Sequence, residues 1–178
     1  MSTFTRTMIS NIERMNGNKE AALYHTFESL ITDRGLISDP EFFLPPNDFD
    51  IVGGVVDSEG GETALIAALD VNEGDSVEWS EILSVITKSE SFLTSCSDYS
   101  SGNPTNLDVL RDNFVRISDR FSLLDNTLLV ILTAGKVSDS VKMEARNYSL
   151  RTEIVDLNEY LGQSEVSSRD ISFSDFGA

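Results

Sequence analysis

The chain has 178 residues, with 13 basic and 30 acidic side chains and a formal net charge of −17. A chain of this length forms one domain with a sizeable core, and its negative charge disfavours nucleic acid wherever no local basic patch exists. The single cysteine excludes an internal disulfide and is typical of a reducing cytoplasm, and one cysteine with one histidine cannot build a zinc site.

The N-terminal part contains a helix signal after a polar start. Residues 1–17 form a polar lead-in without the apolar segment of a secretory signal, so we expect a cytoplasmic protein. Asn18 is a good N-cap for a helix that runs to about Arg34 and stops at Gly35. Residues 36–47, which contain three prolines, are expected to be a linking loop.

Two apolar runs follow, Phe49–Val56 and Thr63–Val71, and turn-forming residues separate them. This pattern predicts a β-hairpin. Because both runs are almost continuously apolar, the two strands are expected at the centre of a sheet that helices cover on both faces.

Symmetric closure of the turn places Gly53 opposite Ile66 and Phe49 opposite Asp70. Side chains alternate between faces, so Ile51 would then share a face with Ile66 and Asp70. The Gly53-Gly54 pair predicts a bulge or a close approach by other backbone, and a bulge would change these relations.

The second half alternates helices and strands. Spacing of apolar residues predicts a helix over about Glu78–Thr94, a polar loop over 95–103, and a further amphipathic helix from Pro104 to about residue 124. The later elements expected are a strand at Thr127–Thr133, a helix at Ser138–Asn147, a strand at Thr152–Val155, a helical turn at Asp156–Leu161 and a late strand at Ile171–Phe173.

This order predicts an α/β domain over residues 18–162. Its mixed sheet would hold an early antiparallel hairpin and later parallel βαβ strands, with helices on both faces. The tail, 163–178, would lead into a further domain, so we expect the chain to be part of a longer protein.

Common catalytic motifs are absent from the sequence. It contains no glycine-rich nucleotide loop, no GxSxG and no HExxH. A metal site could therefore use carboxylates alone, which suits Mg²⁺, Mn²⁺ or Ca²⁺.

The helix, hairpin and later strands resemble the PD-(D/E)XK nuclease-like fold, known as restriction-endonuclease-like. That family places an acid on the first hairpin strand and a (D/E/Q)xK motif on the second. The acids hold a divalent ion against the scissile phosphate and the lysine assists the attacking water. Here Gly53, Ala68 and Asp70 occupy those positions, so all three depart from the pattern.

A closer resemblance is to the N-terminal region of abortive-infection phage-resistance (AIPR) proteins. The stretches FESLITDRGLISDPEF, DIVGGVVDSEGGETALIAALDV, LLVILTAGKVSDSVK and TEIVDLNEYL carry it, and ISFSDFGA is similar to the start of that family's next section. Asp156 matches an aspartate of the family, whereas Glu159 stands where the family has arginine. The resemblance implies a bacterial phage-defence or restriction-associated protein.

Three functions stay open at this point. The first is a catalytically degenerate nuclease-fold domain that serves as a scaffold or docks a protein partner or the rest of a longer chain, without a cofactor. The second is an active nuclease with Mg²⁺ or Mn²⁺, using Glu28, Asp50 and Asp70 for catalysis and the two aspartates as metal ligands, with Asp57 as another candidate acid. The third is an acidic inhibitor that mimics nucleic acid.

Overall fold

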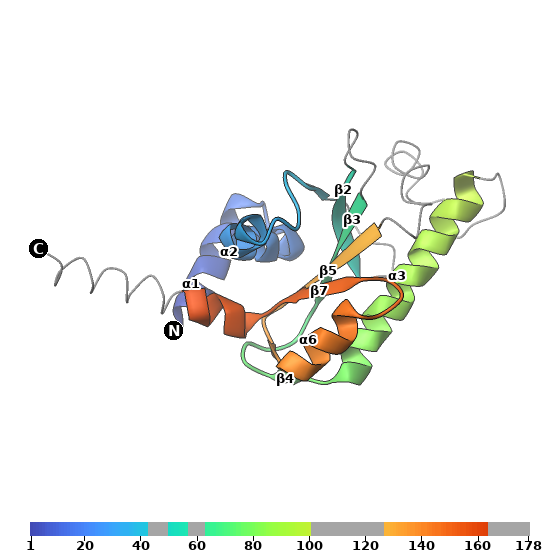
Figure 1. Cartoon of the computed structure of the whole chain (residues 1–178). Helices are drawn as coiled ribbons and strands as arrows, with labels where there is room; N and C mark the ends of the chain where they lie inside the picture. Colours follow the sequence, from blue (N-terminus) through green and yellow to red (C-terminus); the bar gives the residue numbers. More distant parts are fainter. Residues whose placement is uncertain (43–49, 57–62, 101–126, 164–178) are drawn as a thin grey trace, which may run out of the picture.

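The computed structural model describes residues 1–42, 50–56, 63–100 and 127–163 (Figure 1). Within these ranges no helix is long and apolar enough to cross a membrane. The elements are α1 (Thr3–Arg14), α2 (Lys19–Asp33), β1 (Glu41–Phe42), β2 (Ile51–Val56), β3 (Thr63–Leu69), β4 (Ser76–Val77), α3 (Trp79–Ser100), β5 (Thr127–Thr133), β6 (Lys136–Val137), α6 (Asp139–Arg146) and β7 (Thr152–Val155).

The main sheet has five strands in the order β1-β2-β3-β5-β7. Strand β2 is antiparallel to both β1 and β3, whereas β3, β5 and β7 run parallel. The predicted mixed sheet, with an early antiparallel hairpin and later parallel strands, is therefore confirmed. A second, two-stranded sheet pairs β4 with β6.

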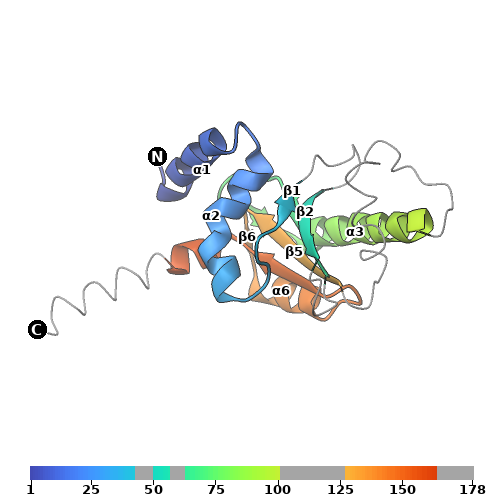
Figure 2. The same ribbon diagram turned by 90° about the horizontal axis from the view of Figure 1, so that it is seen from above.

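Helices cover both faces of the main sheet (Figures 1 and 2). Helices α1 and α2 and the last helical residues, 157–163, lie on one face, and α3 and α6 lie on the other. Alternate residues of β3 divide between the two cores: Leu65 and Ala67 pack toward α3, whereas Ala64 and Ile66 pack toward α2. This alternation is why both hairpin strands are almost continuously apolar.

Polar side chains define where three of the helices begin. Ser2, Asn18 and Ser138 accept hydrogen bonds from backbone N–H groups in the first turns of α1, α2 and α6. Each of them satisfies an N–H group that has no partner inside the helix. The predicted cap at Asn18 is confirmed.

The predicted polar lead-in forms helix α1. Its Phe4 ring is buried and lies 5.7 Å from Phe27 and 5.3 Å from Tyr160, measured between ring centroids. Asn11 is also buried and donates a hydrogen bond to Thr26. Helix α1 thus packs on the same core as α2, although most of its residues are polar.

Three parts of the sequence-based interpretation change. Helix α3 continues to Ser100, so the predicted loop from residue 95 is wrong over its first turns. Strand β1 lies in the segment expected as a loop, and the strands β4 and β6 were not predicted. The helix expected after Pro104, the hairpin turn and the late strand Ile171–Phe173 lie outside the described residues.

A bulge changes the pairing of the hairpin. Gly53 lies opposite Ile66 as predicted, but Ile51 lies opposite Ala67, so β2 has one extra residue at this point. Ile51 therefore packs toward α3, and the predicted shared face of Ile51 and Ile66 is wrong. The Gly53-Gly54 pair predicted such a bulge, and the bulge changes which residues share a face.

Candidate functional site

A groove of about 480 Å³ lies where the parallel strands β3 and β5 end. Ligands of α/β sheets bind preferentially at such carboxyl ends of strands. Apolar side chains from three sources form most of the lining: Phe4, Met8, Ile9 and Ile12 of α1, Leu23 of α2, and Val52, Leu69 and Val71 of the hairpin. Charged residues also line it, namely Lys19, Glu20, Asp50, Asp70 and Glu73.

Two of the three predicted site residues, Asp50 and Asp70, line this groove together. The backbone carbonyl of Asp50 accepts a hydrogen bond from the Ala68 N–H group at 3.0 Å, so Asp50 lies opposite Ala68. Because side chains alternate along a strand, Ala68 and Asp70 belong to one face. The bulge therefore brings the two aspartates to the same side of the sheet.

The carboxylate of Asp50 has a basic neighbour. Its Oδ2 lies 3.3 Å from Nζ of Lys88, which comes from helix α3. Asp70 is exposed and follows the last residue of β3. Asp50 is thus already partly neutralised, while Asp70 faces water.

The structure does not bring Glu28 into this groove. Glu28 lies on α2 eight residues after Glu20, which corresponds to about 12 Å along a helix axis. Its side chain is 54% exposed, and its Oε2 lies 3.1 Å from Nδ1 of His25. Asp57 lies outside the described residues.

The groove includes a contact that sequence reasoning missed. Glu73 accepts hydrogen bonds from the hydroxyl groups of Ser2 and Thr5, both at 2.6 Å, and so ties the start of α1 to the segment after β3. These hydrogen bonds, first that from Ser2 and then that from Thr5, lower the pKa of Glu73. No local signal could have identified the pair, because about 70 residues separate the partners in sequence.

The sequence resemblance would place the first acid of the nuclease family at Gly53. A Cβ atom added there would lie 2.6 Å from the backbone oxygen of Glu41 in β1 and 3.2 Å from the Phe42 ring. The predicted close approach by other backbone is therefore present. The neighbouring strand leaves no space for a side chain at this position.

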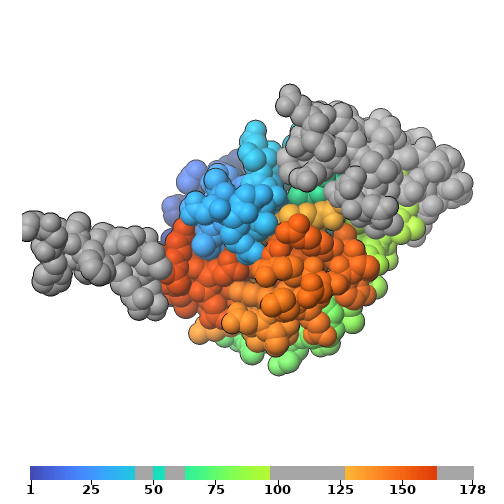
Figure 3. All heavy atoms as spheres, viewed as in Figure 1, coloured from blue at the N-terminus to red at the C-terminus, as the bar shows by residue number. Residues whose placement is uncertain are grey.

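A second polar cluster lies at the β7 edge of the sheet. Glu153 is buried and accepts hydrogen bonds from Arg34, Arg146 and Arg151. Burial raises the pKa of Glu153, but hydrogen bonding and the positive charge of Arg146, with that of Arg34, outweigh burial and hold the pKa below its usual value. In Figure 3, α2 and the residues around β7 and α6 form one continuous surface on this side.

The carboxylate of Asp156 has a structural role. Its buried carboxylate accepts hydrogen bonds from the N–H groups of Val137 at 2.7 Å and Glu159 at 3.1 Å. Nζ of Lys142 lies 2.8 Å from Oδ1 of Asp156. The side chain thereby joins β6, α6 and the start of the helix at 157–163.

The described acids of the groove are not gathered into one tight cluster. Within the described ranges, no group of three or more histidine, cysteine, aspartate or glutamate side chains lies close enough to hold a metal ion. Asp50 is also engaged by Lys88. Asp50 and Asp70 alone would leave most positions around a divalent ion to water or to backbone oxygen atoms.

Comparisons of this chain with family models, with curated proteins and with solved structures found no match.

Proposed function

We propose that this chain is a restriction-endonuclease-like domain of the kind found at the N-terminus of AIPR phage-defence proteins, that it has lost its catalytic site, and that it serves to dock a protein partner. The early antiparallel hairpin, the later parallel strands and the helices on both faces support this assignment. The same order of elements carried the resemblance in the sequence.

The observation that carries the proposal is the packing around Gly53. A catalytic aspartate at this position needs space for a carboxylate and an open path to a metal ion. Strand β1 takes up that space, because an added Cβ would lie 2.6 Å from the Glu41 oxygen. On the second strand, Ala68 packs partly against the core beneath α2 and offers no ligand.

The groove at the strand ends supports the docking part of the proposal. Its floor is apolar, and its charged residues are four acids and one lysine. With Asp50 paired to Lys88, the local charge stays negative. A partner segment with apolar anchors flanked by basic side chains is complementary to this surface.

Calorimetric titration with Mn²⁺ tests the loss of catalysis. We expect no binding of near-micromolar strength by the wild-type chain, the Asp70→Ala variant or the Glu28→Gln variant, which removes an acid outside the groove. Micromolar binding that disappears only in Asp70→Ala, together with Mg²⁺-dependent cleavage of DNA or RNA, would establish the active nuclease instead.

A separate experiment tests docking. The probe is a fluorescent synthetic helix with leucine on one face and lysine on the other, measured by anisotropy. We expect charge reversal at the groove, in Asp70→Lys, to weaken binding roughly tenfold or more, whereas Asp33→Lys, an exposed control at the end of α2, changes it little. Equal weakening by both variants would indicate attraction to the net charge alone and refute a docking groove.

A further inference from the structure

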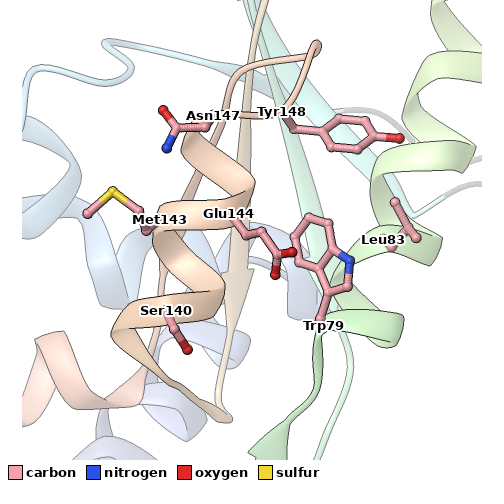
Figure 4. Close-up of a pocket in the computed structure, with 7 residues that line it drawn as sticks. All are labelled: Trp79, Leu83, Ser140, Met143, Glu144, Asn147 and Tyr148. Carbon is pink, nitrogen blue, oxygen red and sulfur yellow. The ribbon is translucent and has the colours of Figure 1, made fainter.

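A second hollow, of about 640 Å³, lies between α3 and α6 (Figure 4). Helices α3 and α6 cover the face of the sheet opposite to α1 and α2, so this hollow is separate from the groove described above. The lining residues are Trp79, Leu83, Ser140, Met143, Glu144, Asn147 and Tyr148. None of them is positively charged.

Two aromatic rings from different elements meet at this hollow. Trp79 begins α3 and Tyr148 follows α6, and their ring centroids lie 6.1 Å apart with an angle of 59° between the planes. Both side chains are only partly buried. The two neighbouring rings therefore form an aromatic part of the lining.

One carboxylate accompanies the rings. Glu144 of α6 and Tyr148, which follows the helix, line the same hollow. Figure 4 shows the Glu144 carboxylate directed toward the Trp79 ring. The Leu83 side chain adds an apolar wall from α3.

We propose that this hollow is a binding site for a quaternary ammonium group, such as the head of choline or the side chain of trimethyllysine. A cation is attracted to the faces of tryptophan and tyrosine within about 6 Å of the ring centroid, and a neighbouring carboxylate adds to that attraction. Methyl groups on the cation suit the apolar lining, whereas a primary ammonium would lose strong hydration there. The site does not depend on the docking function proposed above.

The chain offers a direct readout, because Trp79 is its single tryptophan. Tryptophan fluorescence is followed during titration with choline chloride, with sodium chloride as the control for ionic strength. The neutral isostere 3,3-dimethylbutan-1-ol distinguishes recognition of the charge from apolar binding. A parallel titration with acetyl-trimethyllysine amide shows whether the site prefers trimethyllysine or choline. We expect saturation by choline or by the trimethyllysine amide with a Kd on the order of 1 mM or tighter, and no saturation by the isostere.

Variants then locate the site. Glu144→Gln and Tyr148→Leu should each weaken binding several-fold to about 30-fold, whereas Tyr148→Phe should retain it. Asp139→Asn, which removes another exposed acid of α6, is the matched control and should bind as wild type. Circular dichroism checks that each variant is folded, and the exposed Glu144 supplies a test even where Tyr148→Leu does not fold.

Three results would overturn the proposal. The first is that neither cation saturates the signal up to about 100 mM, a concentration about a hundredfold above the expected Kd. The second is an equal response to the neutral isostere. The third is an unchanged affinity in Glu144→Gln.

Discussion

Replacing Glu153 by glutamine tests the polar cluster at the edge of the sheet. The substitution keeps the size of the side chain but removes the charge that three arginines share. Arg34 reaches Glu153 from the end of α2, and Arg146 reaches it from α6, so the carboxylate links the helix layers on opposite faces of the sheet. Loss of the charge should therefore destabilise the whole domain.

The solvent exposure of Glu153 and its three arginines sets the size of the expected loss of stability. The side chain of Glu153 is 5% exposed, whereas the side chains of Arg34, Arg146 and Arg151 are 24%, 46% and 65% exposed. Breaking a fully buried ion pair costs about 3–5 kcal/mol, but exposed pairs contribute only about 0–1 kcal/mol. Arg146 and Arg151 can turn into water after the substitution, while Arg34 retains hydrogen bonds to Glu159 and the Ile154 carbonyl. We expect a loss of about 2 kcal/mol in the free energy of unfolding.

The pH dependence gives a second readout. The folded pKa of Glu153 is lowered, so its stabilisation is complete above the unfolded value of about 4.3 and is lost as the pH falls through the folded pKa. Urea denaturation from about pH 7 to about pH 3 should show the difference between wild type and Glu153→Gln shrinking toward zero. Glu28→Gln, at an exposed acid, should change stability by less than about 0.5 kcal/mol. A difference below about 0.5 kcal/mol at neutral pH for Glu153→Gln, or one that persists undiminished in acid, would refute this reasoning.

Three further predictions concern single positions. Gly53→Ala should destabilise the fold by about 1–3 kcal/mol in urea denaturation, because the added Cβ would meet the Glu41 oxygen. Gly162→Ala, which has open space around it, should be neutral or slightly stabilising, and equal effects of the two substitutions would contradict the packing argument. Burial raises the pKa of Cys96 to about 12, so the thiol of the folded protein should resist iodoacetamide at neutral pH and react only after unfolding. Rapid alkylation of the folded protein would argue against that burial. Glu73→Gln should speed amide hydrogen exchange in α1 at neutral pH. The folded pKa of Glu73 is lowered, so the difference from wild type should fade only as the pH falls through that pKa and the carboxylate is protonated. Unchanged exchange would mean that this contact does not hold α1.

The regular part of the fold follows from patterns that lie within single segments. Strands β5 and β7 begin and end at the predicted residues, and β5 is an apolar run between two threonines. Strands β1, β4 and β6 have two residues each, which is too short for any periodicity. Helix α3 continues through the polar sequence Ser95–Ser100, where composition alone favoured a loop.

The candidate site was less predictable because its parts come from distant segments. Asp70 could be identified as a charge at the end of an apolar strand. The contacts of Glu73 with the start of α1 and of Arg34 with Glu153 join residues that only the tertiary structure brings together. Glu28 was selected by its charge on the first predicted helix, yet a helix presents its side chains in every direction, and Glu28 faces water beside His25.

One extra residue in β2 decides how the two aspartates relate. In a hairpin without the bulge, Gly53 opposite Ile66 would place Asp50 opposite Leu69, whose side chain packs toward α3. By strand alternation, Asp50 and Asp70 would then point to opposite faces of the sheet. Because a shift of one residue moves a side chain to the other face, the bulge between Ile51 and Gly53 brings Asp50 to the side of Asp70. Gly53, where strand β1 leaves no space for a side chain, thus lies directly beside the bulge that brings the two aspartates to one end of the strand.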